Sequence, residues 1–209
     1  MKTLLLVGAT GLVGQSVMQQ ALNDARVARL VAPTRRPLAP HPRLENPRVD
    51  FDALPAAAPW WAVDGVICTL GTTIRKAGSQ AAFRRVDYDY PLAVAELAHR
   101  HGAGAFAFTS SIGANPRSRT FYLRTKGETE RALAGCGFPS LTLVRPSFIG
   151  GERAERRPLE SLALAFFGGI SRLMPRRYRV VPAERIARSL LAAAFAAEPG
   201  VRIVESEAI

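Results

Sequence analysis

The stretch that decides the fold is "MKTLLLVGATGLVG", residues 1–14. Its apolar run ends at a glycine, which is typical of a strand buried on both faces of a sheet. Gly8, Gly11 and Gly14 then form a G-x-x-G-x-x-G turn, and helical periodicity continues over residues 11–24. Glycines at this spacing permit a tight turn, a close approach of phosphate to the backbone, and close packing of helix on strand. The stretch therefore predicts the phosphate-binding turn of a dinucleotide site, formed by Gly8, Thr10, Gly11, Leu12, Val13 and Gly14.

A basic second residue before an apolar run is also typical of a secretory signal peptide. Three glycines within seven residues interrupt that run, however, and no small-x-small cleavage site with a polar flank precedes the helix. The two cysteines, Cys68 and Cys136, lie in apolar surroundings and favour buried, reduced thiols. We therefore expect a cytoplasmic location. No stretch approaches eighteen apolar residues, so we expect no membrane span.

Strand-like and helical patterns alternate along the chain. The predicted strands are residues 3–9, 29–35, 48–51, 64–70, 105–111, 140–146 and 201–206, and the predicted helices are 11–24, 79–100, 120–135, 159–170 and 182–196. This order predicts an α/β, doubly wound Rossmann fold, with a mostly parallel sheet flanked by helices and a small C-terminal substrate-side region. At 209 residues we expect one domain, with a cofactor-binding core at 1–150 and substrate-side and C-terminal segments at 151–209.

The formal net charge of +11 raises the question of nucleic-acid binding. The chain holds 28 basic residues of which three are lysines, and the arginines are spread along it rather than clustered. This pattern favours a compositional habit, and no nucleic-acid-binding motif is recognisable, so we expect no nucleic-acid partner. His99 and His101 lack further residues at metal-ligand spacing, and we expect no metal.

The end of the second predicted strand indicates which dinucleotide binds. An acidic residue there would bind the ribose 2′-hydroxyl of NAD, whereas an arginine suits the 2′-phosphate of NADP. The strand ends in "TRRP", with Arg35 and Arg36 at this place. We therefore expect NADP(H), with NAD the less favoured alternative.

A second motif indicates acid–base chemistry. "YLRTK" places Tyr122 and Lys126 four residues apart, on one face of a predicted helix. A lysine cation nearby favours the phenolate of a tyrosine and lowers its pKa from the ordinary value of about 10. Ser110 and Ser111 end the preceding strand, and either hydroxyl could bind a substrate carbonyl. These residues predict a proton donor, its activator and a polarising group.

The chain resembles the extended or atypical short-chain dehydrogenase/reductases in "VGATGLVG" (7–14), "TSS" (109–111), "YLRTK" (122–126) and "RPSFIGG" (145–151). More narrowly, the segments 68–98, 121–130 and 204–209 resemble the Tat-interacting-protein oxidoreductases, and the likeness covers essentially the whole chain. The resemblance implies Ser111, Tyr122 and Lys126 as the catalytic set, with Ser110 as the alternative serine. It also implies further cofactor contacts from Asp50, Phe51, Leu70, Gly71, Thr72, Thr73, Ser110, Tyr122, Lys126, Arg145, Pro146, Ser147 and Ile149.

Two functions follow from these patterns. The first is an NADP(H)-dependent oxidoreductase that acts on an unidentified carbonyl or alcohol substrate. The second is a non-catalytic NADPH-binding regulator or scaffold, because the resemblance extends to proteins that bind the cofactor without a confirmed substrate. For either function we expect a small-molecule ligand and a monomer or homodimer.

Overall fold

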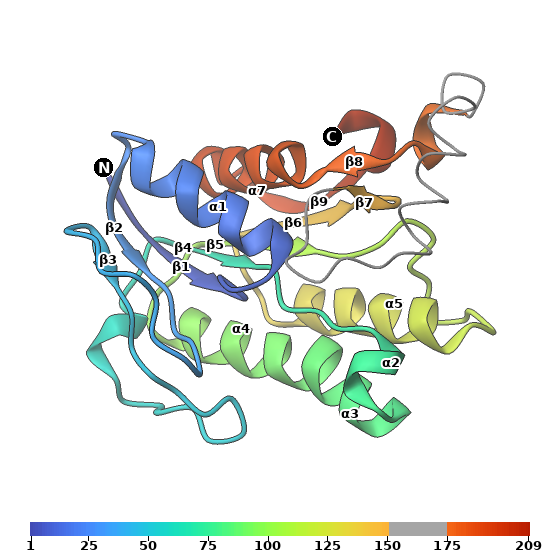
Figure 1. Ribbon diagram of the computed structural model, residues 1–209, viewed down its shortest axis with the longest axis horizontal. Helices are drawn as coiled ribbons and strands as arrows, with labels where there is room; N and C mark the ends of the chain where they lie inside the picture. The colour runs from blue at the N-terminus through green and yellow to red at the C-terminus, as the bar shows by residue number, and fades with distance from the viewer. Residues whose placement is uncertain (151–174) are drawn as a thin grey trace.

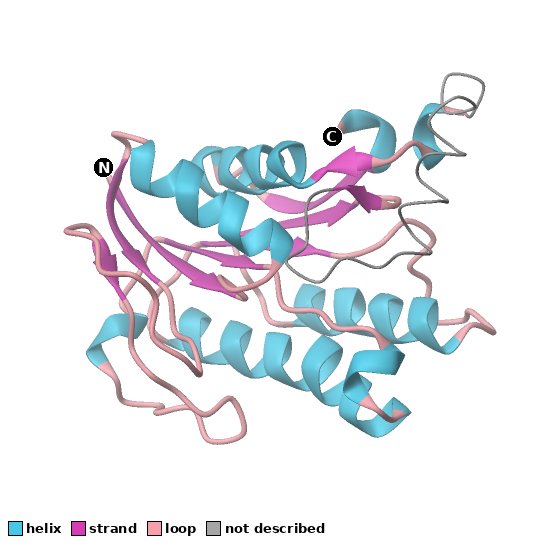
Figure 2. Cartoon of the chain, in the orientation of Figure 1, coloured by secondary structure: helices cyan, strands magenta, loops and turns pink. Residues whose placement is uncertain are grey.

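The computed structural model describes residues 1–150 and 175–209, and Figure 1 shows their arrangement. Seven parallel strands form one sheet in the order β3-β2-β1-β4-β5-β6-β9, and β7 pairs with β8 in a separate two-stranded ribbon. Helices cover both faces of the large sheet (Figure 2). The predicted Rossmann fold is confirmed.

The elements of the large sheet and its helices have the following bounds. The strands are β1 (Lys2–Val7), β2 (Val27–Val31), β3 (Leu44–Glu45), β4 (Gly65–Cys68), β5 (Ala105–Thr109), β6 (Ser140–Arg145) and β9 (Gly200–Glu205). The helices on them are α1 (Leu12–Asn23), α2 (Ile74–Ala77), α3 (Gln80–Arg84), α4 (Tyr90–Arg100), α5 (Phe121–Gly135) and α7 (Ala183–Ala196). The small ribbon consists of β7 (Ile149–Gly150) and β8 (Val181–Pro182).

The alternation of side chains along β1 explains why two helix layers form. Leu4 and Leu6 point to one face and pack with α1 and α7, whereas Leu5 and Val7 point to the other face and pack with α4 and α5. All four side chains are fully buried. Period-two alternation in a strand that is apolar throughout therefore builds two cores, one on each side of the sheet.

The sheet has its topological switch between β1 and β4. The chain proceeds from β1 to β2 and β3 on one side, then returns so that β4 pairs with the opposite edge of β1. In open parallel sheets a crevice forms outside the carboxyl ends of strands that diverge in this way. The turn after β1 and the loop after β4 are therefore adjacent at one edge of the sheet.

The third strand differs from its prediction. Its ladder with β2 involves only Leu44 and Glu45, and the predicted strand at 48–51 contributes a single bridge from Arg48 to Thr34. Asn46 and Pro47 separate the two pairings. The Asn46 side chain donates to the Ala32 carbonyl, and proline lacks the N–H that a ladder needs.

The predicted helix at 79–100 is confirmed, with one irregularity. Between α3 and α4 the backbone widens into a π-helical turn, η2 (Arg85–Asp89). The predicted helix at 159–170 lies outside the described residues. Across 1–150 and 175–209, every helix is too short or too polar to cross a bilayer.

Candidate cofactor and active site

The turn after β1 requires glycine at two of its positions. Gly8 has φ of +89°, a left-handed conformation, and a Cβ added there would lie 2.6 Å from Thr69 Oγ1. A Cβ at Gly14 would lie 2.0 Å from the Gly8 carbonyl oxygen. The first helical turn is therefore pressed against the strand end, which is the close packing that the motif predicts.

The start of α1 presents backbone donors at this turn. Gly11 is the N-cap residue and has no side chain to accept a hydrogen bond from the helix. Helix N-termini carry unpaired N–H groups and a partial positive charge, so they attract anions. In the described structure the turn and the helix start border a cavity, and no side-chain cap competes with a ligand there.

This cavity has a volume of about 620 Å³ and lies at the carboxyl edge of the sheet. Most of the predicted cofactor residues line it. They are Thr10, Gly11, Leu12, Val13, Arg36, Leu70, Gly71, Thr72, Thr73, Ser110, Tyr122, Lys126 and Ile149. The structure thus brings together residues from the ends of β1, β2, β4 and β5, from α5 and from β7.

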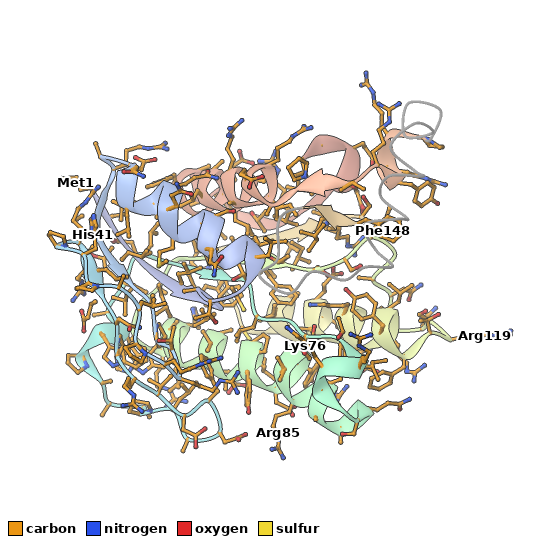
Figure 3. The ribbon with its side chains drawn as sticks, viewed as in Figure 1. Met1, His41, Lys76, Arg85, Arg119 and Phe148 are labelled. Carbon is orange, nitrogen blue, oxygen red and sulfur yellow. The ribbon has the colours of Figure 1, made fainter. Side chains whose placement is uncertain are left out.

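Five further residues line the cavity and were not predicted. They are Gln15, Thr69, Lys76, Asp87 and Thr109. Lys76 lies on α2 and is labelled in Figure 3. Two of the five extend segments that were predicted, since Thr69 precedes Leu70 and Thr109 precedes Ser110.

Tyr122 and Lys126 both line the cavity from α5, as their spacing predicts. The Tyr122 ring packs on Phe83, with ring centroids 5.7 Å apart. Lys126 is almost fully buried, and its Nζ lies 2.8 Å from Asp87 Oδ1 and 3.4 Å from the Thr109 carbonyl oxygen. The contact with Asp87 is an ion pair rather than a well-directed hydrogen bond.

The environment of Lys126 has opposing effects on its pKa. Burial disfavours the ammonium, while the negative charge of Asp87 favours it, and the net result raises the pKa of Lys126 above its usual value of 10.5. The nearby Cys68 thiol is fully buried, which raises its pKa to about 12. At neutral pH the lysine is therefore a cation and the cysteine is a neutral thiol.

The two serines at the end of β5 differ in their surroundings. Ser110 lines the cavity, and its buried Oγ has no hydrogen-bond partner among the described residues. Ser111 is absent from the described lining, and its Oγ donates to the Ile112 carbonyl, 3.3 Å away. The structure therefore brings the alternative serine, Ser110, to the cavity in place of the predicted Ser111.

Three predicted residues after the second and third strands lie away from the described cavity wall. Arg35 is exposed, and its neighbour Arg36 takes the lining position. Asp50 is exposed, and its Oδ1 accepts a hydrogen bond from the Asp52 backbone. Phe51 is buried in the core between the sheet and α4, and its ring centroid lies 5.5 Å from that of Tyr90.

The residues after β6 also have structural partners in place of the cavity. Arg145 makes two hydrogen bonds to Glu130, of 2.9 and 2.6 Å, and a third to Glu205. The hydrogen bonds to Glu130 raise the pKa of Arg145 above the usual value of an arginine. The Pro146 carbonyl accepts from the Ile112 backbone, and Ser147 donates to the Arg179 carbonyl. Only Ile149 of the predicted residues in this segment lines the described cavity.

Within residues 1–150 and 175–209, no three histidine, cysteine, aspartate or glutamate side chains gather as metal ligands. The ring of His101 makes a 2.8 Å hydrogen bond to the Ala56 carbonyl oxygen. His99 packs on Phe138 with ring centroids 4.9 Å apart.

No protein-family model matches the chain, but individual proteins do. The protein HTATIP2 of Rattus norvegicus is 35% identical over 195 residues, which are 91% of this chain and 80% of that protein. The protein FMP52, mitochondrial, of Coccidioides immitis is 31% identical over 178 residues, covering 78% of this chain and 72% of that protein.

Solved structures share the fold at low sequence identity. MoeE5 in complex with UDP-glucose and NAD superimposes with a TM-score of 0.73 at 19% identity, over 96% of this chain and 74% of that one. The Bordetella bronchiseptica enzyme WbmH in complex with NAD+ gives a TM-score of 0.71 at 18% identity, over 99% and 76%. The Rossmann architecture is therefore the same.

The predicted cytoplasmic location is wrong. Fungal relatives from Coccidioides immitis, Emericella nidulans and Lodderomyces elongisporus are named as mitochondrial proteins, which contradicts it. The prediction relied on the rejection of a secretory signal peptide and on two cysteines in apolar surroundings. Such thiols distinguish a reducing compartment from an oxidising one, and they do not distinguish between two compartments that both keep thiols reduced.

The identity to HTATIP2 extends over most of both proteins, and the predicted strand, glycine turn and helix are present in the structure. The chain also shares its fold with a UDP-N-acetylglucosamine 4-epimerase and with the PhqB reductase domain, at TM-scores of 0.74 and 0.70. The chain belongs to the atypical short-chain dehydrogenase/reductases, in the group of HTATIP2 and FMP52.

Proposed function

We propose that this protein is an NADP(H)-dependent oxidoreductase that interconverts a carbonyl compound and an alcohol. The observation that carries the proposal is the meeting of the glycine turn, Tyr122 and Lys126 at a single cavity. A phosphate-binding turn alone would support only nucleotide binding. Tyr122 and Lys126 at the same cavity form an acid–base pair, which supports proton transfer in addition to nucleotide binding.

The residues fit a nicotinamide dinucleotide. The Gly8 turn has no room for a side chain, and the start of α1 offers backbone donors for a pyrophosphate. Arg36 lines the cavity after β2, where the 2′-phosphate of NADP would lie, and the sequence "PTRR" places no acidic residue there. NAD is present in the structures of MoeE5 and WbmH, which show that this fold holds such a cofactor.

The chain's own residues supply the proton chemistry. A bound nicotinamide would supply the hydride for a carbonyl carbon, or accept one from an alcohol carbon. Tyr122 gives its hydroxyl proton to the carbonyl oxygen in the direction of reduction and takes it back in oxidation. The Lys126 ammonium stabilises the phenolate that remains. The Ser110 hydroxyl, which has no hydrogen-bond partner among the described residues, donates to the substrate oxygen.

The test of the cofactor is fluorescence titration of the protein with NADPH and with NADH. We expect NADPH to bind more tightly. Arg36→Ala is expected to weaken NADPH binding by about tenfold to a hundredfold, the size of one hydrogen bond to a charged group, with little effect on NADH. Arg35→Ala is the matched control, because Arg35 is a neighbouring exposed arginine outside the described cavity lining. Tighter binding of NADH by the unaltered protein would contradict the proposal.

The two serines give a second prediction. Ser110→Ala is expected to lower turnover by about tenfold to a hundredfold, because it removes a donor to the substrate oxygen. Ser111→Ala is expected to leave turnover nearly unchanged, since its hydroxyl donates to a backbone carbonyl. Initial rates at saturating NADPH measure both variants. The reverse order of effects would assign the role to Ser111.

A further inference from the structure

Asp87 is a fully buried carboxylate at the cavity that the reaction above does not use. It lies on the inner side of the π-helical turn η2. Arg85, two residues earlier, extends outward into solvent (Figure 3). Burial of a carboxylate is costly unless partners compensate for the lost water. The groups that compensate for the burial of the Asp87 carboxylate therefore indicate its role.

The two carboxylate oxygens of Asp87 contact two different elements. Oδ1 lies 2.8 Å from Lys126 Nζ on α5. Oδ2 accepts a 2.8 Å hydrogen bond from the backbone N–H of Thr72, in the loop that follows β4. Thr129 on α5 also donates to the Asp87 backbone carbonyl, over 2.9 Å. One residue thus joins the helix of Tyr122 to a loop that lines the cavity.

The local backbone is irregular at this residue. The helical run from Gln80 to Arg100 is α-helical on both sides of η2 and π-helical across it. Single π-helical turns within α-helices occur frequently at functional sites. The irregularity coincides with the acidic side chain that enters the site.

We propose that Asp87 is a positioning residue of this site, whose buried carboxylate anchors the Lys126 ammonium and joins it to the cavity-lining loop at Thr72. The part of this inference that concerns the cofactor rests on the proposed function. The part that concerns the ion pair does not. The two parts therefore need separate measurements.

The charged and titratable groups that face Lys126 come from three elements. Asp87 approaches from η2, Cys68 from the end of β4, and Tyr122 from the same helix. The Phe108 ring on β5 lies 4.9 Å from Nζ and carries no charge. Asp87 is therefore the anion that offsets the burial of the lysine at neutral pH, because the Cys68 thiol stays protonated.

The first measurement is the melting temperature of Asp87→Asn as a function of pH. The amide keeps the size of the carboxylate and an oxygen for Thr72. In the unaltered protein the pKa of Lys126 is raised, so the stabilisation by the pair is complete below pH 10.5 and is lost as the pH rises through the folded-state pKa. In the variant the charge of Asp87 no longer offsets burial, which is the largest influence and lowers the pKa of Lys126, so the variant gains stability as the lysine deprotonates.

We therefore expect Asp87→Asn to melt about 10 °C below the unaltered protein near neutral pH. The gap should narrow steadily as the pH approaches the usual pKa of a lysine. The series is repeated with Tyr122→Phe in both proteins, which removes the proton of Tyr122 from the comparison. Asp89→Asn is the matched control, because Asp89 is an exposed aspartate of the same turn and should cost little at any pH.

A gap that stays constant with pH would overturn the proposal. The Lys126→Met background gives an independent decision. Asp87→Asn should cost much less there, and without pH dependence, because no buried cation remains. An equal cost in both backgrounds would also overturn it. Should Asp87→Asn fail to fold alone, a folded Asp87→Asn, Lys126→Met double variant supports the proposal, and an unfolded one overturns it.

The second measurement is NADPH binding by the same variants. We expect Asp87→Asn to bind NADPH about tenfold more weakly than the unaltered protein at mildly alkaline pH, with a smaller loss at neutral pH, because the variant loses the ammonium first. A loss of equal size at every pH would reject the link between Asp87 and cofactor binding. If the unaltered protein binds neither NADPH nor NADH, the proposed function fails, and the melting series still decides the role of Asp87.

Discussion

Tyr122→Phe is expected to lower turnover by about two to four orders of magnitude on any substrate that the protein converts. The substitution removes one hydroxyl, the proposed proton donor, and keeps the ring that packs on Phe83. The variant should therefore fold normally, and it should still bind NADPH. The rate is followed by nicotinamide absorbance, in a screen of carbonyl compounds with NADPH at saturation.

The control for this variant is Tyr88→Phe. Tyr88 is a tyrosine of the η2 turn that lies beneath the Arg84 guanidinium and is absent from the described cavity lining. It should retain full activity. Equal activity of Tyr122→Phe and the unaltered protein would reject the mechanism. Tight NADPH binding by a protein that converts no compound in the screen would instead favour a non-catalytic NADPH-binding regulator.

Gly14→Ala is expected to destabilise the fold by about 3 kcal/mol or more and to lower the melting temperature by about 10 °C. The added Cβ would meet the carbonyl oxygen and carbon of Gly8 at 2.0 and 2.7 Å and Ala9 Cα at 2.9 Å. These are backbone atoms, so no side-chain rotation relieves the contact. The strand and the helix must move apart, and NADPH binding should be lost with the geometry of the turn.

Gly11→Ala is the matched control in the same turn. The Cβ at this position would have one near neighbour, the Gly8 carbonyl oxygen at 3.3 Å, and the backbone has φ of −81°, which alanine adopts freely. The melting temperature should therefore change little. Thermal unfolding measures both variants, and a Gly14→Ala protein as stable as Gly11→Ala would contradict the close packing of α1 on β1.

Local patterns in the sequence predict the frame of the site. The turn from Gly8 to Gly14 and the pair of Tyr122 and Lys126 depend on spacing along one strand–helix junction or one helix face. These spacings are set by local secondary structure, so they can be read from the sequence without knowledge of the tertiary fold. Thr10 to Val13 of the turn line the described cavity together with Tyr122 and Lys126, while Gly8 and Gly14 allow the tight packing of the turn without lining it.

Long-range partners explain what the sequence did not predict. Arg145 was expected at the cofactor, but Glu130 on α5 and Glu205 on β9 hold it, and neither is near it in the sequence. The pairing of Asp87 with Lys126 joins residues 39 positions apart in the same way. One local signal did exist for Asp87. It is an acidic residue on a helix face whose other members, Phe83 and Pro91, are buried.

The order of strands in the sheet has a consequence for how the protein acquires its binding site. β1 lies between β2 and β4, and Leu4 pairs with Gly65. The carboxyl edge of the sheet, where the cavity lies, is therefore complete only after segments distant in the sequence have paired. Parallel pairings between distant segments form slowly, because the chain loses the entropy of loop closure before it gains the stabilising contacts between the strands. A ligand that fills the cavity binds only the folded chain, in which the sheet is complete. At a hundred times its dissociation constant it would therefore favour the native chain over the unfolded one by about 2.7 kcal/mol.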